Sequence, residues 1–232
     1  MTKITVRENH LFDNCTGIED PINVHGTFQQ VVAVNEDRRE LTVRYMHRET
    51  AGFPSFAQGD EVEFSRKDTM LPVEHATGIV ERIISGPTGD SSEVESLTDT
   101  VIRFREALPE EVEANAYVVE NITFTPEVEV RNCEFREIPT RGVLVTSRKP
   151  IVIENNAFCK LSMAPIYISC DANNWYESGR VGDVLIRNNK FYNCQGDGVI
   201  FIDPVIEKAS EERTVHKNIR IEENEIHYSE KN

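Results

Sequence analysis

A six-residue pattern recurs five times along the chain and constrains the fold more than any other feature. Its consensus is a β-branched residue, a charged residue, a polar residue, Asn, any residue and an apolar residue. The copies are Val6–Leu11, Val130–Phe135, Ile153–Phe158, Ile186–Phe191 and Ile221–Ile226. Apolar alternation predicts a strand in each copy, and the Asn-rich step predicts a turn, because Asn tolerates the left-handed backbone region.

The spacing of the copies predicts the architecture. The copies that begin at residues 130, 153, 186 and 221 are 23, 33 and 35 residues apart. One coil of a parallel β-helix takes roughly 20–25 residues, so the two longer intervals predict insertions of about 10 and 12 residues. Stacked coils would place the Asn side chains in register, at roughly 4.8 Å per step, where they can form a hydrogen-bonded ladder.

A second strand is predicted after each of the first four copies, and each opens with a Pro or Gly that marks a corner of the coil. Aligned on these corners, the residues expected to point inward are Ile22 and Val24, Val143 and Val145, Ile166 and Ile168, and Val199 and Phe201. The column before the corner then contains Asp20, Arg141, Ala164 and Asp197. The outward column contains Asn23, Leu144, Tyr167 and Ile200, and the next contains His25, Thr146, Ser169 and Ile202. This outer face is polar and aromatic, which favours a groove that binds a sugar.

The stretch between the first two copies is too long for one coil and has a different pattern. Short strands such as Phe28–Val34 and Glu40–Met46 are joined by acidic turns, which predicts a small antiparallel barrel or sandwich. We therefore predict an all-β chain: a parallel β-helix with an inserted antiparallel β domain. Residues 1–26 form the first coil, residues 27–116 the inserted domain, and residues 117–232 the remaining coils.

Charge and composition exclude several classes of protein. With 25 basic and 40 acidic residues the net charge is −15, so nucleic acid and anionic lipid are not expected partners. The longest apolar run, Gly198 to Ile202, is far too short to span a membrane. The five cysteines form no C-x-x-C pair, and no second His or Cys stands at ligand spacing, so we predict neither a metal site nor a cofactor. Met1–Arg7 contains no apolar signal segment, which leaves the compartment open.

Several longer motifs occur in a fixed order. They are Glu19–Thr27, Tyr45–His47, Gly59-Asp60, Arg141–Thr146 and Asp171–Gly179. Together they resemble glycoside hydrolase family 110, the α-1,3-galactosidases. The resemblance implies a right-handed β-helix with an inserted barrel, a secreted or periplasmic location, and metal-free removal of terminal α-1,3-linked galactose with inversion. It also implies further coils upstream of Met1, so that this chain would be a C-terminal portion or a shortened relative.

Inverting hydrolysis requires one carboxylic acid that protonates the leaving oxygen and one carboxylate that activates water. Asp20 stands at a predicted corner and is the first candidate, with its neighbour Glu19 or the more distant Asp171 as the second acid. Two adjacent acids in a partly buried groove would raise one pKa, which suits such a pair. Each also has a structural interpretation: Asp20 could cap a turn, and Asp171 could bind the backbone amides of its own loop.

The predicted substrate-binding residues are Asn23, His25, Arg141, Trp175 and Glu177. Trp175 is the only tryptophan and stands among amide side chains, so it could stack on a galactose ring or fold back against the β-helix. Arg141 could hold a sugar hydroxyl or pair with the carboxylates of neighbouring coils. His25 could bind substrate or be an ordinary satisfied polar residue.

The expected partner is thus a galactose-terminated oligosaccharide or glycoconjugate. The main alternative is a non-catalytic carbohydrate-binding β-helix that retains the platform without a complete acid–base pair. A purely structural β-helix is a third hypothesis, against which the polar and aromatic tract Asn173–Glu177 argues. Because an open β-helix end exposes unpaired strand edges, a cap or a homodimer is expected to cover it.

Overall fold

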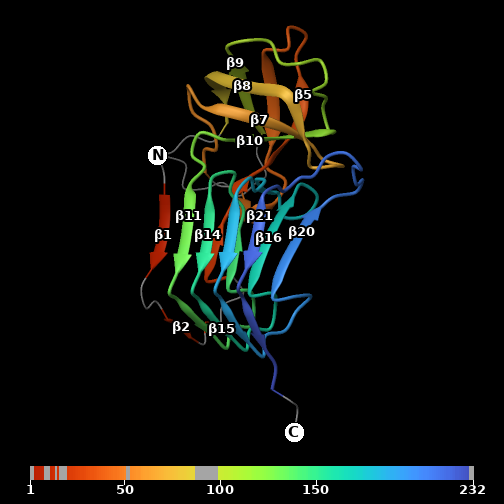
Figure 1. Cartoon of the computed structure of the whole chain (residues 1–232). Helices are drawn as coiled ribbons and strands as arrows, with labels where there is room; N and C mark the ends of the chain where they lie inside the picture. The colour runs from red at the N-terminus through yellow and green to blue at the C-terminus, as the bar shows by residue number, and fades with distance from the viewer. Residues whose placement is uncertain are drawn as a thin grey trace.

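The chain folds into two β-structured parts, a β-helix and a barrel, as the computed structural model in Figure 1 shows. The structure describes residues 3–7, 11–13, 15, 20–50, 53–86 and 99–229. Apart from one 3-10 turn, η1 (Arg48–Thr50), every regular element among these residues is a strand. The all-β prediction is confirmed, and in the described residues no helix is long and apolar enough to cross a membrane.

Three parallel sheets build the β-helix, and the chain visits them in turn. The first sheet contains β1 (Lys3–Arg7), β11 (Glu127–Arg131), β14 (Ile151–Glu154), β18 (Val184–Arg187) and β21 (Ile219–Glu222). The second contains β2 (Leu11–Asp13), β12 (Glu134–Arg136), β15 (Ala157–Cys159), β19 (Lys190–Tyr192) and β22 (Glu225–His227). The third contains β3 (Ile22–Val24), β13 (Val143–Val145), β16 (Ile166–Asp171) and β20 (Ile200–Val205).

The predicted Asn ladder lies at the turn between the first and second sheets. The Asn156 backbone N–H donates to Asn189 Oδ1 at 3.0 Å, and the Asn189 N–H donates to Asn224 Oδ1 at 2.9 Å. In the four described copies the residue just before the ladder position has a positive φ of 54–56°. These residues are Asn132, Asn155, Asn188 and Glu223. Two neighbouring positions therefore act together: the first adopts the left-handed conformation, and the Asn after it joins consecutive coils.

Identical aromatic residues stack through the interior. The rings of Phe12, Phe135, Phe158 and Phe191 lie 4.8, 4.7 and 5.1 Å apart, all with interplanar angles of 9°. The last three are buried, and aliphatic residues of the other two sheets complete the same core. The five cysteines are free thiols, three of them buried.

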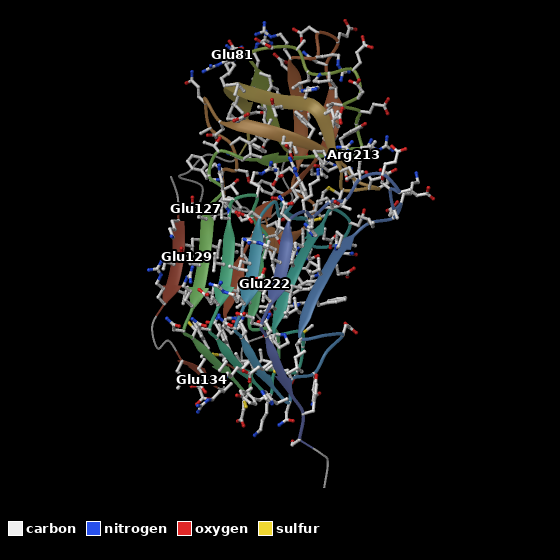
Figure 2. All side chains as sticks on the ribbon, viewed as in Figure 1. Glu81, Glu127, Glu129, Glu134, Arg213 and Glu222 are labelled. Atoms are coloured by element: carbon white, nitrogen blue, oxygen red, sulfur yellow. The ribbon has the colours of Figure 1, made fainter. Side chains whose placement is uncertain are left out.

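Charged side chains follow one another on the outer surface of the first sheet, where Figure 2 shows Glu129 and Glu222 projecting from β11 and β21. Glu129 pairs with Lys3 at 2.6 Å and with Arg7. Glu154 pairs with Arg131 and Arg187 of the coils on either side. These ladders join neighbouring coils.

The predicted alignment of the last corner is wrong by one residue. Ile200, rather than Val199, pairs with Ile166, and Phe201 pairs with Tyr167 on the outer face. The cause is the length of the corner: Ile200 comes nine positions after Phe191, whereas Ile166 comes eight positions after Phe158. Consequently Asp197 does not share the column of Asp20 and Arg141, and Asp203, rather than Ile202, pairs with Ser169.

The inserted part is a closed antiparallel barrel of six strands. These are β5 (Gln29–Val34), β6 (Glu40–Arg44), β7 (Glu61–Arg66), β8 (Pro72–Ser85), β9 (Asp99–Phe104) and β10 (Tyr117–Asn121), closed in the order β10-β5-β6-β9-β8-β7. Strand β10 follows residue 116, where the sequence placed the domain boundary, and pairs with β7 over its whole length. The barrel thus closes only when the chain returns toward the β-helix.

Two short strands and a buried ionic network connect the parts. Strand β4 (Gly26–Thr27), which leads into the barrel, pairs antiparallel with β17 (Glu177–Ser178) from the insertion after β16. The buried barrel residues Glu63 and Glu120 pair with Arg148, and Glu63 also accepts two hydrogen bonds from Arg180. This network holds the barrel against the loops that follow β13 and β17.

Candidate functional site

A groove lies on the outer face of the third sheet, bordered by the insertion after β16 and by η1 of the barrel. It consists of a cavity of about 480 Å³ and an adjoining cavity of about 350 Å³. Both are lined by Asn23, Glu49, Trp175 and Glu177, so they form one continuous groove.

Seven of the eight predicted site residues line this groove. Asp20, Asn23, Arg141, Asp171, Trp175 and Glu177 line the larger cavity, and His25 lines the adjoining one. The eighth, Glu19, lies outside the described residues. Residues from three coils and one insertion therefore converge, although their functional roles stay predictions.

Asp20 is held by the next coil. Its Oδ1 accepts a hydrogen bond from the Arg141 backbone N–H at 2.9 Å, and its Oδ2 lies 3.4 Å from Arg141 Nη1. The Arg141 guanidinium also stacks on the ring of Tyr167, 4.5 Å from its centroid. The predicted pairing of Arg141 with a neighbouring carboxylate is thus present, and it fixes the direction in which Asp20 presents its carboxylate.

Asp171 organises the loop that follows it. Its carboxylate accepts hydrogen bonds from the backbone N–H groups of Asn173, Asn174 and Trp175 at 2.6, 2.9 and 2.9 Å. The side chain is buried, and all three acceptor contacts are local. This geometry matches the structural interpretation of Asp171 and leaves its oxygens poorly placed to exchange a proton with substrate.

Glu177 and His25 lie side by side in the groove. His25 Nδ1 lies 2.7 Å from the carbonyl oxygen of Gly26 and so donates its N–H there, which leaves Nε2 3.5 Å from Glu177 Oε1. Burial raises the pKa of Glu177 above its ordinary value; His25 and Arg141 oppose the rise, and the nearby carboxylates of Asp171 and Asp20 reinforce it. A carboxylic acid that keeps its proton to higher pH is suited to proton donation.

Trp175 faces the groove rather than folding onto the β-helix. Half of its surface is exposed, and its ring contacts His47 of the barrel with centroids 4.7 Å apart. The Asp171 cap described above fixes the backbone beneath it. A held, exposed indole is a suitable platform for the apolar face of a sugar ring.

Two residues that line the groove were not among the predicted site residues. Glu49 comes from η1 of the barrel, although Tyr45–His47 nearby belongs to one of the family motifs. Tyr167 lines the groove, and its ring stacks on Phe201 at 5.5 Å. Tyr167 was on the predicted outer face, but only the correct register places Phe201 beside it.

The site offers carboxylates, an imidazole, a guanidinium and an indole, but no metal-binding cluster. Among the described residues no group of three or more His, Cys, Asp or Glu side chains is placed to hold a metal ion. Fold and groove together define a parallel β-helix protein with an inserted barrel and an acidic, aromatic groove on its third sheet.

Comparisons with known proteins specify the family. Residues 118–232 match the right-handed β-helix region family, and residues 40–84 match the GLAA-B β-barrel domain II family. Proteins named α-1,3-galactosidase A are 46% identical over 89% of this chain in Streptomyces avermitilis and 45% identical over 97% in Peterkaempfera griseoplana. One named α-1,3-galactosidase B from Bacteroides thetaiotaomicron is 38% identical over 93% of the chain.

The resemblance that the motifs indicated is confirmed: proteins named α-1,3-galactosidase are similar to this chain over most of its length. The chain spans about a third of the length of these relatives, namely 32%, 31% and 34% of them.

Proposed function

We propose that the groove binds a terminal α-1,3-linked galactose of a glycan and hydrolyses its glycosidic bond with inversion. The observation that carries the proposal is the convergence of Asp20, Arg141, Trp175 and Glu177 in one groove. Relatives named α-1,3-galactosidase support the same substrate. Trp175 would stack on the sugar, while Asn23 and Arg141 would hydrogen-bond its hydroxyl groups.

The carboxylates receive different roles from their surroundings. Asp20 accepts hydrogen bonds from Arg141 and so is held as an acceptor, the form in which a carboxylate takes a proton from water. Glu177, with its raised pKa, would protonate the leaving oxygen. This assignment replaces Asp171 as second acid, because the three backbone hydrogen bonds of Asp171 occupy its carboxylate.

The test is incubation of the chain with an α-1,3-galactosyl disaccharide, with free galactose and its anomer followed by proton NMR. Initial release of β-galactose is the expected result. Asp20→Asn and Glu177→Gln should each lower kcat about 10²- to 10⁴-fold, whereas Glu222→Gln on the far sheet should not change it. With an aryl α-galactoside whose leaving group needs no protonation, the loss in Glu177→Gln should shrink while that in Asp20→Asn persists.

Activity should also depend on pH through Glu177. Because the acid acts in its protonated form, kcat should fall as pH rises through the raised pKa of Glu177. The Glu177→Gln variant should lack this alkaline limb. An unchanged limb in that variant would exclude Glu177 as the acid.

A second candidate function is sugar binding without hydrolysis. It is favoured by the half-exposed indole of Trp175, which can stack on a sugar ring without any acid–base pair. Galactoside binding with no galactose release over days would establish it in place of the hydrolase.

A further inference from the structure

A second cavity, of about 310 Å³, lies next to the groove and takes no part in the chemistry proposed above. The paired strands β4 and β17 separate the two spaces. Glu177 lines the groove, whereas Gly26, Thr27 and Gly179 line the second cavity. His25 lines both this cavity and the smaller part of the groove, so a ligand longer than one sugar could reach from one to the other past its imidazole.

Two largely exposed aromatic rings distinguish this cavity, which we call the phenylalanine pocket. Phe53 is 44% exposed and Phe124 is 66% exposed, and both line it together with Pro54 and Pro126. Exposed apolar rings that line one cavity are typical of a binding site, whereas scattered ones are ordinary surface. Their planar faces suit the C–H face of a pyranose ring.

The wall that carries Phe53 is fixed by the barrel. The hydroxyl group of the buried Tyr45 donates to the Phe53 carbonyl oxygen, and the two rings meet edge to face at 6.0 Å. Asn121 Nδ2 donates to the Ser55 carbonyl oxygen at 2.9 Å. The wall is therefore formed before any ligand arrives.

The wall that carries Phe124 is fixed in the same way. Asn121 Oδ1 accepts a hydrogen bond from the Thr123 N–H at 2.9 Å, and Thr125 Oγ1 donates to the Ile122 carbonyl oxygen at 3.1 Å. Ser147 Oγ of the β-helix donates to the Pro126 carbonyl oxygen. A preformed pocket avoids the entropic cost of ordering its walls on binding.

The polar groups of the phenylalanine pocket indicate an uncharged ligand. Arg148 lines it and, among the described residues, donates side-chain hydrogen bonds only through Nη2, to Glu63 and Glu120. The N–H groups of Nε and Nη1 are left as donors for hydroxyl oxygens. Two carboxylates and two guanidiniums balance in the Glu63–Arg148–Glu120–Arg180 network, so neither a cationic nor an anionic ligand gains from it.

We propose that the phenylalanine pocket binds a second, neutral sugar unit of the same glycan whose terminal galactose occupies the groove. The ring stacks between Phe53 and Phe124, and its hydroxyl groups accept hydrogen bonds from Arg148. This subsite rests on the proposed function, because its ligand is the remainder of the galactoside. It would select for neutral oligosaccharides over single galactose residues.

The experiment compares two probes by NMR titration of the isotopically labelled chain. Methyl α-galactoside reports the groove alone, and a thio-linked α-1,3-galactosyl oligosaccharide reports both spaces. The oligosaccharide should bind more tightly, and Phe124→Ala should weaken it about three- to tenfold while leaving methyl α-galactoside unchanged. Phe53→Ala should act in the same direction. The control is Tyr228→Ala on the last coil; Tyr228 is as exposed as Phe124, and its substitution should have no effect.

The outcomes separate this subsite from the groove. If methyl α-galactoside binds but Phe124→Ala and Phe53→Ala keep the full gain of the oligosaccharide, the subsite is refuted and the groove stands. If methyl α-galactoside does not bind, the proposed function fails and the subsite fails with it. A uronate-containing oligosaccharide that gains as much as the neutral one would overturn the neutral specificity.

Discussion

The β-helix and the barrel reach their closed structures by different means. In the β-helix each buried side chain meets its counterpart from the next coil, as Phe158 meets Phe135 and Phe191. In the barrel unlike strands pair, and β8 meets both β7 and β9 through shifts of register. A repeated contact fixes alignment along the whole stack, whereas a barrel contact is made once and fixes one pair of strands.

The groove uses both kinds of structure. Its floor is the outward column of the third sheet, which the repeat supplies, whereas its rim comes from an insertion and from η1 of the barrel. The repeat gives a rigid platform of regular spacing, and the non-repeated segments add side chains that no coil shares. This division explains why the described catalytic candidates, Asp20 and Glu177, come from a corner and an insertion rather than from the middle of a strand.

The largest effect is expected where the two parts meet. Arg148→Ala would remove one partner of Glu63 and, among the described residues, the one guanidinium that pairs with Glu120. In this buried interface the loss should cost about 3–5 kcal/mol of unfolding free energy. Urea denaturation measures it. Arg44→Ala, which breaks the exposed pair with Asp99, is the control and should cost about 0–1 kcal/mol. Equal losses in the two variants would mean that the interface network adds no more than a surface pair.

A smaller loss is expected inside the repeat. Asn189→Ala removes the acceptor of the Asn156 N–H and the donor to the Ile153 carbonyl oxygen, both at the buried turn. Leaving these groups unpaired should cost about 2–4 kcal/mol, measured by denaturation. Faster hydrogen exchange of the Asn156 amide would locate the loss in the ladder. Asn174→Ala, on the exposed loop, should lie within about 0.5 kcal/mol of the parent chain.

The repeat made most of the β-helix predictable. The spacing of its copies predicted parallel coils, the Asn ladder and the outward face, because every coil must satisfy the same packing. The error arose at the last corner, where alignment on Gly198 ignored one additional residue between Phe191 and Ile200. A corner is free to change length, and one residue turns every following side chain to the opposite face.

The site was predictable in membership but not in chemistry. Seven of the eight residues named from the motifs line the groove. The hydrogen bonds of Asp171 to three backbone amides and the contact of Glu177 with His25 depend instead on the course of a loop. Glu49 was missed because its placement requires the barrel to sit against the third sheet. Such contacts join segments distant in sequence and leave no local pattern.

The insertion between β20 and β21 contains a histidine, His216, whose pKa is strongly shifted. Burial lowers the pKa of His216 to about 4, and its Nδ1 accepts a hydrogen bond from the Val181 N–H at 3.2 Å. The unfolded chain therefore binds a proton that the folded chain does not between the ordinary pKa of 6.5 and about 4. Stability that is complete above pH 6.5 should fall by about 3 kcal/mol as pH drops to about 4.

Denaturation of His216→Gln across this pH range is the corresponding measurement. The variant should lose the part of the acid-induced fall that His216 causes, whereas His75→Asn, at an exposed position of strand β8, should retain it. An identical slope in His216→Gln and the parent chain would show that the imidazole titrates normally in the folded state.

The smallest effect is expected from a substitution that would extend the Asn ladder to the second coil. Cys133 occupies the position that Asn156, Asn189 and Asn224 hold in the later coils. Each of those Asn side chains donates a hydrogen bond from Nδ2 to a backbone carbonyl oxygen of the preceding coil, at 2.9–3.0 Å. The acceptor is always the residue that begins the six-residue pattern. At the second coil the corresponding acceptor is the Val6 carbonyl oxygen, which lies 3.8 Å from Cys133 Sγ.

Cys133→Asn should therefore replace a weak thiol contact by an amide hydrogen bond to Val6 and raise the unfolding free energy by about 1 kcal/mol. Cys159→Asn, at a half-buried position outside the ladder, should bring no gain. A loss of stability in Cys133→Asn would mean that the buried turn of the second coil cannot accommodate the amide. The repeat would then be a property of the later coils alone, and the first coil would be aligned by its strands β1 and β2 rather than by the ladder.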